Sequence, residues 1–138
     1  MKRLALIGAA ALVLAACGGG GGGNSPADQI KSAYTSFFTT KGSADAHVAL
    51  LENGSKFKDV IQQLLLNPNA GDASATVSKV TLQGADNAVV VYSVRLGAFS
   101  LKDRTGSAVL QGGKWKVAYG TLCALIALSG STPSACDG

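Results

Sequence analysis

The stretch of residues 88–96, AVVVYSVRL, decides the fold class of this chain. Its side chains alternate with a period of two, because Ser93 and Arg95 point to the side opposite Tyr92. Alternation of this kind is typical of a strand with one face on a core and the other in water, as in antiparallel sheets. The residues on the apolar face are Ala88, Val90, Tyr92, Val94 and Leu96.

Three more segments with strand character surround this stretch. A turn at residues 84–87 precedes it, and Gly112-Gly113 is typical of a two-residue hairpin turn further along the chain. We therefore predict a four-stranded antiparallel meander. The other strands are predicted at residues 76–83, at residues 101–111, with an irregularity around 103–106, and at residues 114–119.

Helical periodicity comes before the strands. Ser25 can cap a helix, Pro26 suits its first position, and Asp28 lies three residues after the cap. The apolar residues that follow share one helical face, and the helix should end near Thr40. These apolar residues are Ile30, Ala33, Tyr34, Phe37 and Phe38.

Two more helices are predicted before the sheet. Ser43 can cap a helix that ends at Asn53-Gly54, and Ser55 can cap another that ends before Pro68. Their apolar positions are Ala44, Val48 and Leu51, then Phe57, Val60, Ile61, Leu64 and Leu65. Helices followed by strands predict an α+β domain, with the N-terminal helices packed on one face of the four-stranded antiparallel sheet.

The chain opens with a basic and then apolar leader. Residues 1–3 are MKR and residues 4–14 are apolar apart from one glycine. This is the plan of a secretory signal, and it is too short for a membrane-spanning helix. Leu14-Ala15-Ala16-Cys17 resembles the bacterial lipobox, which implies that residues 1–16 are a lipoprotein signal peptide and that Cys17 is acylated. The alternatives are an ordinary secretory signal with a chance cysteine and an uncleaved anchor helix.

Residues 17–25 form a glycine-rich segment behind the leader. Glycine has no side chain to pack and loses much backbone entropy on ordering, so we expect a flexible tether. A phosphate-binding glycine loop is the alternative, but no strand precedes the glycines and no Gly-Lys-Ser/Thr follows them. The remaining residues 26–138 suit one domain with a modest core.

The charge pattern gives little support to nucleic-acid binding. Of 12 basic and 8 acidic residues, Lys2 and Arg3 lie in the leader, which leaves 10 basic residues and a net charge of about +2. The charges are scattered as single residues rather than gathered in a basic stripe. We expect instead a membrane contact through the lipid anchor, at the outer face of the cell membrane.

Cys123 and Cys136 remain once Cys17 is assigned to lipid. An even pair in an exported domain is expected to form a disulfide. It would fold the tail back onto a short, buried helix at residues 121–129, which Thr121 caps. A metal site would need more ligands, since His47 is the single histidine. We therefore expect neither a metal nor a cofactor.

Several segments together resemble a known superfamily. The chain is similar to the cone-shaped α+β fold of the nuclear-transport-factor-two-like (cystatin-like) superfamily, and more narrowly to small actinobacterial envelope lipoproteins and the mycobacterial low-molecular-weight secreted antigen family. The resemblance implies an exported, envelope-associated protein and transfers no catalytic or binding residue. It is carried by Phe37-Phe38, residues 50–57 (LLENGSKF), residues 89–94, residues 113–117 (GKWKV) and Cys123.

The resemblance also defines which side chains to consider for catalysis. Enzymes of the wider superfamily place Asp, His or Tyr inside the cone, and the candidates here are Tyr34, Tyr92, Tyr119 and His47. The tyrosines lie on predicted core faces, where packing alone explains them. We expect His47 to be partly exposed, off the apolar face of its helix, with no carboxylate placed to orient it.

We therefore predict a non-catalytic envelope lipoprotein whose domain binds an apolar small molecule or an envelope protein. One alternative is a structural or antigenic surface protein with a filled core, and another is an enzyme that acts through Tyr34 or Tyr92 and His47. A ligand pocket between helices and sheet would be lined by Tyr34, Phe37, Leu64, Tyr92 and Trp115.

Overall fold

The computed structural model describes residues 25–39, 43–66, 73–96, 99–128, 130 and 132–137. The predicted signal peptide, the acylated Cys17, most of the tether and the Asn67-Pro68 helix stop lie outside these residues. Those predictions therefore stay predictions.

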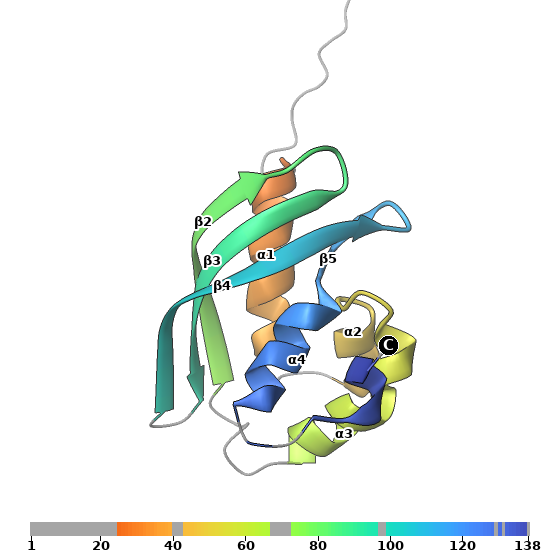
Figure 1. The fold of residues 1–138 in the computed structure, drawn as a ribbon. Coiled ribbons are helices and arrows are strands. Elements are labelled where there is room, and N and C mark those ends of the chain that lie inside the picture. Colours follow the sequence, from red (N-terminus) through yellow and green to blue (C-terminus); the bar gives the residue numbers. More distant parts are fainter. Residues whose placement is uncertain are drawn as a thin grey trace, which may run out of the picture.

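The four strands form one antiparallel sheet with the order β2-β3-β4-β5, as the sequence predicts. The sheet is curled into a half-barrel (Figure 1). The alternation in the central stretch is confirmed, because Ala88, Val90, Tyr92 and Val94 are buried. The strands are β2 (Ala73–Leu82), β3 (Asn87–Leu96), β4 (Phe99–Gln111) and β5 (Lys114–Val117).

The predicted irregularity in the third strand is confirmed at Asp103. Its φ of 53° is left-handed, and its backbone N–H donates to Ser93 Oγ at 3.1 Å. The register between β3 and β4 shifts here, between Tyr92 and Val94. β5 is two residues shorter than predicted, because helix α4 already begins at Tyr119.

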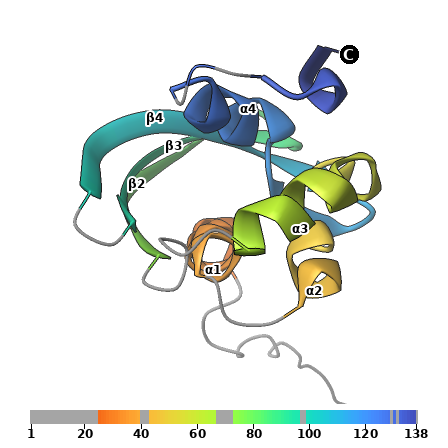
Figure 2. The same cartoon turned by 90° about the horizontal axis from the view of Figure 1, so that it is seen from below.

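Helix α1 (Pro26–Phe38) lies inside the curl of the sheet (Figure 2). Ser25 caps it as predicted, and its Oγ accepts from Asp28 N–H at 3.2 Å. α1 packs against the two outer strands, β2 and β5, so it fills the concave side. The helix ends at Phe38, slightly earlier than predicted, because Thr39 is extended.

The second predicted helix is wrong in length. α2 spans only Ala44–Val48, although Ser43 caps it as predicted. Leu51, which was expected on its apolar face, forms a parallel bridge to Val117. Glu52 N–H donates to Val117 O at 2.8 Å and Val117 N–H donates to Leu50 O at 2.9 Å. This pairing to β5 takes the backbone groups that a longer helix would use.

The third helix begins differently from the prediction. A 3-10 helix, η1 (Gly54–Phe57), leads into α3 (Lys58–Leu66), so Ser55 is not an α-helix cap. Gly54 is required by close approach, since a Cβ there would lie 2.0 Å from Val48 O. Phe57 and Ile61 are buried in the core as their periodicity predicts.

The C-terminal part begins with α4 (Tyr119–Ala127) and includes the 3-10 helix η3 (Ser134–Asp137). The predicted disulfide is confirmed: Cys123 and Cys136 are bonded, with their Cα atoms 5.8 Å apart. Two expectations for this helix are wrong. Thr121 is not its cap but a buried residue of its first turn, and the segment is not buried on all sides, since Leu128 is exposed.

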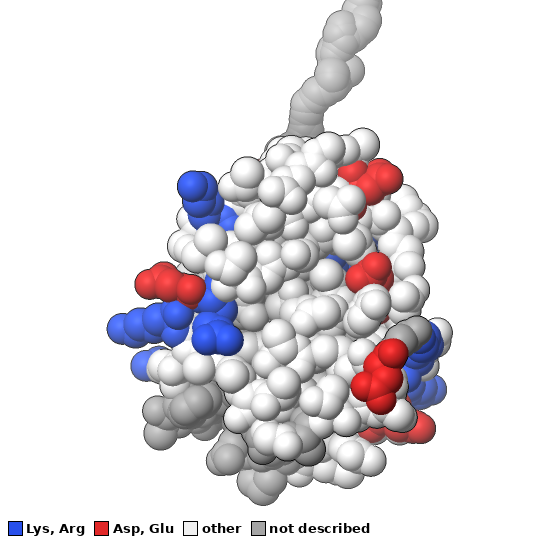
Figure 3. Space-filling model, in the orientation of Figure 1, with Lys and Arg blue, Asp and Glu red and all other residues white. Residues whose placement is uncertain are grey.

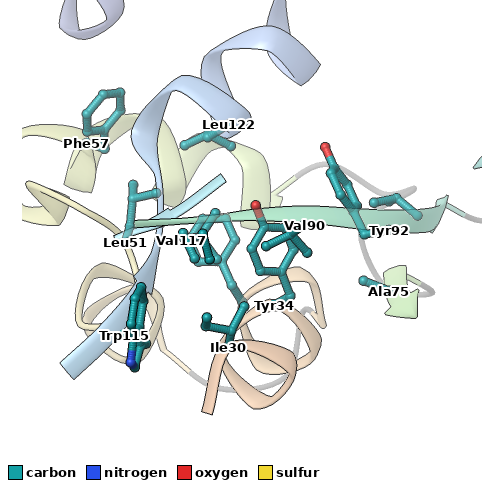
Figure 4. Close-up of a cluster of buried hydrophobic side chains, with 14 of the residues drawn as sticks. Ile30, Tyr34, Leu51, Phe57, Ala75, Val90, Tyr92, Trp115, Val117 and Leu122 are labelled. Atoms are coloured by element: carbon teal, nitrogen blue, oxygen red, sulfur yellow. The ribbon is translucent and has the colours of Figure 1, made fainter. Parts of the chain in front are cut away.

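The core lies between α1, the concave face of the sheet and the helices beside β5 (Figure 4). Its largest fully buried side chains are Tyr34, Tyr92, Phe57, Ile30, Leu51, Val90 and Val117. Figure 4 shows Leu122 of α4 above this layer, so α4 closes the core on the side opposite α1.

Candidate functional site

A cluster of aromatic rings occupies the concave face where α1 meets β3. Tyr34 lies 5.1 Å from Tyr92 between ring centroids, and Phe38 is stacked on Tyr92 at 5.7 Å. Phe37 contacts Phe38 edge to face at 5.1 Å. The helical spacing of the α1 residues places their rings on one face, and the strand alternation points Tyr92 toward them. The two tyrosine hydroxyls in this cluster have different surroundings.

The Tyr34 hydroxyl is fully used by the fold. It donates to Ser107 O at 2.6 Å and lies 3.3 Å from Thr121 Oγ1, which in turn accepts from Ser107 N–H at 2.9 Å. Burial raises the pKa of Tyr34 well above the ordinary value of 10.0, and the contact with Thr121 offsets only part of that rise. The hydroxyl therefore ties α1 to β4 and α4 as a neutral donor.

The Tyr92 hydroxyl is buried without a hydrogen-bond partner among the described residues, although only 2% of this residue is exposed. Figure 4 shows that it points away from α1. Burial raises the pKa of Tyr92, and the positive charge of Arg104 opposes the rise. The phenol therefore keeps its proton near neutral pH and can donate a hydrogen bond to an acceptor.

Two cross-strand neighbours complete the surroundings of Tyr92. In the sheet register, Val77 of β2 and Arg104 of β4 stand opposite it on either side, so all three share the concave face. Arg104 and Phe38 are half-buried. We call Tyr92, Phe38, Val77 and Arg104 the Tyr92 site. It combines an apolar surface with two hydrogen-bond donors.

His47 corrects one prediction, because it is buried rather than partly exposed, with 5% of the residue accessible. Its Nδ1 lies 2.8 Å from Ser43 O and its Nε2 lies 2.7 Å from Thr39 O. The ring also contacts Phe37 at 5.9 Å. The periodicity of the sequence does not predict the burial of His47. Its ring joins the end of α1 to the start of α2, and this contact forms only in the tertiary structure. Neither ring nitrogen is left for a substrate in this conformation.

The structure brings together three of the five predicted pocket residues. Tyr34, Phe37 and Tyr92 belong to one aromatic cluster, whereas Trp115 is buried on β5, beyond Val117 from Tyr92 (Figure 4). Leu64 of α3 is 39% exposed and does not join the buried core.

Tyr119, another catalytic candidate, stands in α4 and stacks on Phe57 at 5.8 Å. Arg104 is not among the site residues predicted from the sequence. The alternation of β4 was a usable signal, but the register shift at Asp103 obscured which face Arg104 would take.

The described part of the chain contains neither a cluster of metal-ligating side chains nor a membrane-spanning helix. Within these residues there is no group of three or more His, Cys, Asp and Glu side chains that could hold a metal ion. None of the helices in the described ranges is long and apolar enough to cross a membrane. On the face seen in Figure 3, the charged side chains lie toward the margins and leave a broad uncharged centre.

Fold and site together define a class of protein: a small, disulfide-bonded α+β domain with a curled antiparallel sheet around one helix and a buried phenol that can donate a hydrogen bond. Within this class, the chain belongs to the family described as low molecular weight antigen MTB12, C-terminal domain, whose model matches residues 24–133. The predicted resemblance to the low-molecular-weight antigen family is thereby confirmed. No curated protein matches the chain.

Proposed function

We propose that this protein is an envelope lipoprotein, anchored by Cys17 to the outer face of the cell membrane, whose non-catalytic domain binds an apolar ligand. The observation that carries the ligand-binding part is the Tyr92 hydroxyl, which is buried beside the Phe38 ring and lacks a partner among the described residues. Buried hydroxyls in folded proteins nearly always have a hydrogen-bond partner, and a bound molecule would supply one to Tyr92.

The anchor is supported by the leader and by the start of the fold. Residues 14–17, LAAC, have the lipobox order, and the glycine run separates Cys17 from helix α1, which begins at Pro26. Two acyl chains anchor a protein stably where one chain does not. The membership in an antigen family agrees with a secreted, surface-exposed protein.

The non-catalytic assignment is supported by how the candidate groups are used. Both His47 nitrogens face backbone carbonyls, and the Tyr34 hydroxyl donates to Ser107. General acid–base catalysis needs a free, positioned group that can change its protonation state near the working pH. Tyr92 has a raised pKa and favours donation of a hydrogen bond over proton abstraction.

A fractionation experiment tests the anchor. Cys17→Ala should abolish incorporation of an alkyne-labelled fatty acid and move the protein from the membrane fraction to the soluble one, because the acylated sulfur is removed. Gly20→Ala, which leaves the lipobox intact, is the matched control and should behave as the natural chain. If the Cys17→Ala protein stays in the membrane fraction, the anchor proposal is wrong.

Native mass spectrometry tests the ligand. Protein extracted from its own envelope should carry a small-molecule mass that denaturation releases, and that mass should be absent after refolding from denaturant. A protein without any retained molecule, and without a crosslinked partner, would contradict this part of the proposal.

A protein partner is the second candidate, favoured by the close contact of the aromatic rings. Tyr34, Phe37, Phe38 and Tyr92 fill much of the concave face with their own rings, at centroid distances of 5.1 to 5.8 Å. A filled core would direct binding to the surface. Chemical crosslinking in intact cells, followed by mass spectrometry, would then find one recurrent envelope protein.

A further inference from the structure

We infer that the Tyr92 site binds the anionic head group of a single-chain amphiphile, a carboxylate or a phosphate, through the Tyr92 hydroxyl and the Arg104 guanidinium. This inference rests on the proposed function and adds the chemical class of the ligand and the residues that select it.

The Tyr92 hydroxyl is buried with its hydrogen-bonding capacity unused by the described residues. Its raised pKa keeps the hydroxyl protonated, and the described residues supply no acceptor for that proton. Tyr34, in ring contact with it, shows the contrast, since its own hydroxyl donates to Ser107 O at 2.6 Å. The Tyr92 hydroxyl is therefore the group that can take up an external acceptor.

Arg104 brings a positive charge to the Tyr92 site. It stands directly across from Tyr92 in the β3–β4 register, and its positive charge acts on the phenol. Its neighbour Asp103 takes a left-handed backbone where the register shifts, and it makes no ion pair with Arg104. The ion pair seen among the described residues, Lys58 with Asp45, lies elsewhere, on α3 and α2. Arg104 is thus a half-buried residue without a carboxylate partner among the described residues.

The Tyr92 phenol and the Arg104 guanidinium together favour an anionic ligand group. A guanidinium donates hydrogen bonds and accepts none, and the protonated Tyr92 phenol has no acceptor for its own hydrogen among the described residues. A ligand group whose atoms accept hydrogen bonds and donate none would therefore match both groups. Carboxylate and phosphate oxygens are such groups, and charge-assisted hydrogen bonds to them are the stronger ones. A cation would be repelled, and a neutral alcohol would leave the guanidinium charge unmatched.

The apolar side chains beside Tyr92 suit the alkyl part of the ligand. The Phe38 ring is stacked on Tyr92 with an angle of 11° between the planes, and Val77 flanks Tyr92 on the other strand. Both Phe38 and Val77 are half-buried at the margin of the core. An alkyl chain next to the head group would contact these side chains, which is why an amphiphile fits better than a free inorganic anion.

Titration with short amphiphiles tests the inference. The full acylated chain is placed in zwitterionic nanodiscs and titrated by calorimetry with octanoate, octyl phosphate and octanol, with empty nanodiscs as blanks. At least one of the two anions should bind about tenfold more tightly than octanol, since a charge-assisted pair is added. Octanoate binding better identifies a fatty-acid-like ligand, and octyl phosphate binding better identifies a lipid phosphate.

Three variants assign the effect to the site. Arg104→Gln should remove the roughly tenfold preference for the anion, and Tyr92→Phe should weaken anion binding by about fivefold. Lys102→Gln is the matched control, because it removes the same charge from an exposed position of the same strand, and it should leave the preference intact.

The outcomes separate the two proposals. Equal affinity for octanol and both anions in the natural chain overturns the head-group inference and leaves apolar binding standing. An equal loss of the preference for anions in Lys102→Gln and Arg104→Gln also overturns it, since non-specific electrostatic attraction would then explain that preference. Absence of binding by all three compounds overturns the ligand-binding part of the proposed function as well. The comparison of ligands on the natural chain decides the question even if a variant fails to fold.

Discussion

At the scale of single residues, Gly106 explains how two helices reach the sheet at one point. It stands opposite Val90 on the concave face, and a Cβ there would lie 2.8 Å from the Thr121 side chain and from Tyr34 Oη. The space that a side chain would occupy is taken by the hydrogen-bonded group of Tyr34, Thr121 and Ser107. Close packing in a protein interior leaves little room to adjust.

We predict that Gly106→Ala lowers the free energy of unfolding by about 1–3 kcal/mol, because the added methyl displaces this group. Urea denaturation followed by circular dichroism measures the change. Gly120→Ala is the matched control, since no atom lies within 4 Å of its Cβ position and alanine favours a helix. If the two variants lose the same stability, the packing argument at Gly106 fails.

The Tyr34 hydroxyl makes stability depend on pH. Its pKa is raised by burial above 10.0, so the native state favours the protonated form. The stabilisation is complete below pH 10.0 and falls as the pH rises further, because the unfolded chain then loses a proton that the native chain keeps.

We therefore predict that the urea midpoint falls between about pH 9 and pH 11, and that the fall is smaller in Tyr34→Phe. Urea titrations at both values measure it. An identical fall in the natural chain and in Tyr34→Phe would show that Tyr34 does not contribute.

At the scale of elements, the strands follow their sequence pattern and the short helices do not. The period of two in residues 88–96 places alternate side chains on opposite faces whatever the neighbours are. Helix α2 is different, since only five residues are helical and Leu50 and Glu52 pair with Val117 instead. A short helix has little stability of its own, so a tertiary hydrogen bond decides where it ends.

The C-terminal elements depend on the disulfide. Cys123 of α4 and Cys136 of η3 are 13 residues apart, and both sulfur-bearing residues pack against the core. Closing a loop of this size stabilises a folded chain by about 3 kcal/mol, by restricting the unfolded state.

We predict that the paired change Cys123→Ala and Cys136→Ala lowers the free energy of unfolding by about 2–4 kcal/mol. Thermal unfolding with and without reductant measures it. The reductant should lower the melting temperature of the natural chain and have no effect on the double variant, which is the control. A melting temperature of the natural chain that reductant leaves unchanged would contradict the prediction.

At the scale of the whole molecule, the curl of the sheet creates the candidate site. β2 and β4 flank β3, so the curl gathers Val77, Tyr92 and Arg104 around the C-terminal end of α1. Each residue comes from a different strand, and the sequence distance between Val77 and Arg104 gives no hint of their proximity. Only Tyr92 of these three was predicted as a site residue.

The sequence by itself determined the α+β class, the four antiparallel strands, the first helix with its Ser25 cap and the Cys123–Cys136 pair. These features depend on local periodicity, on helix capping and on an even number of cysteines, all of which can be read directly from the sequence. The tertiary structure alone decided the burial of His47, the early end of α2, the exposure of Leu64 and the meeting of Tyr92 with Arg104. Those features depend on strand register and on loop closure, in which a shift of one residue changes the partner of every side chain.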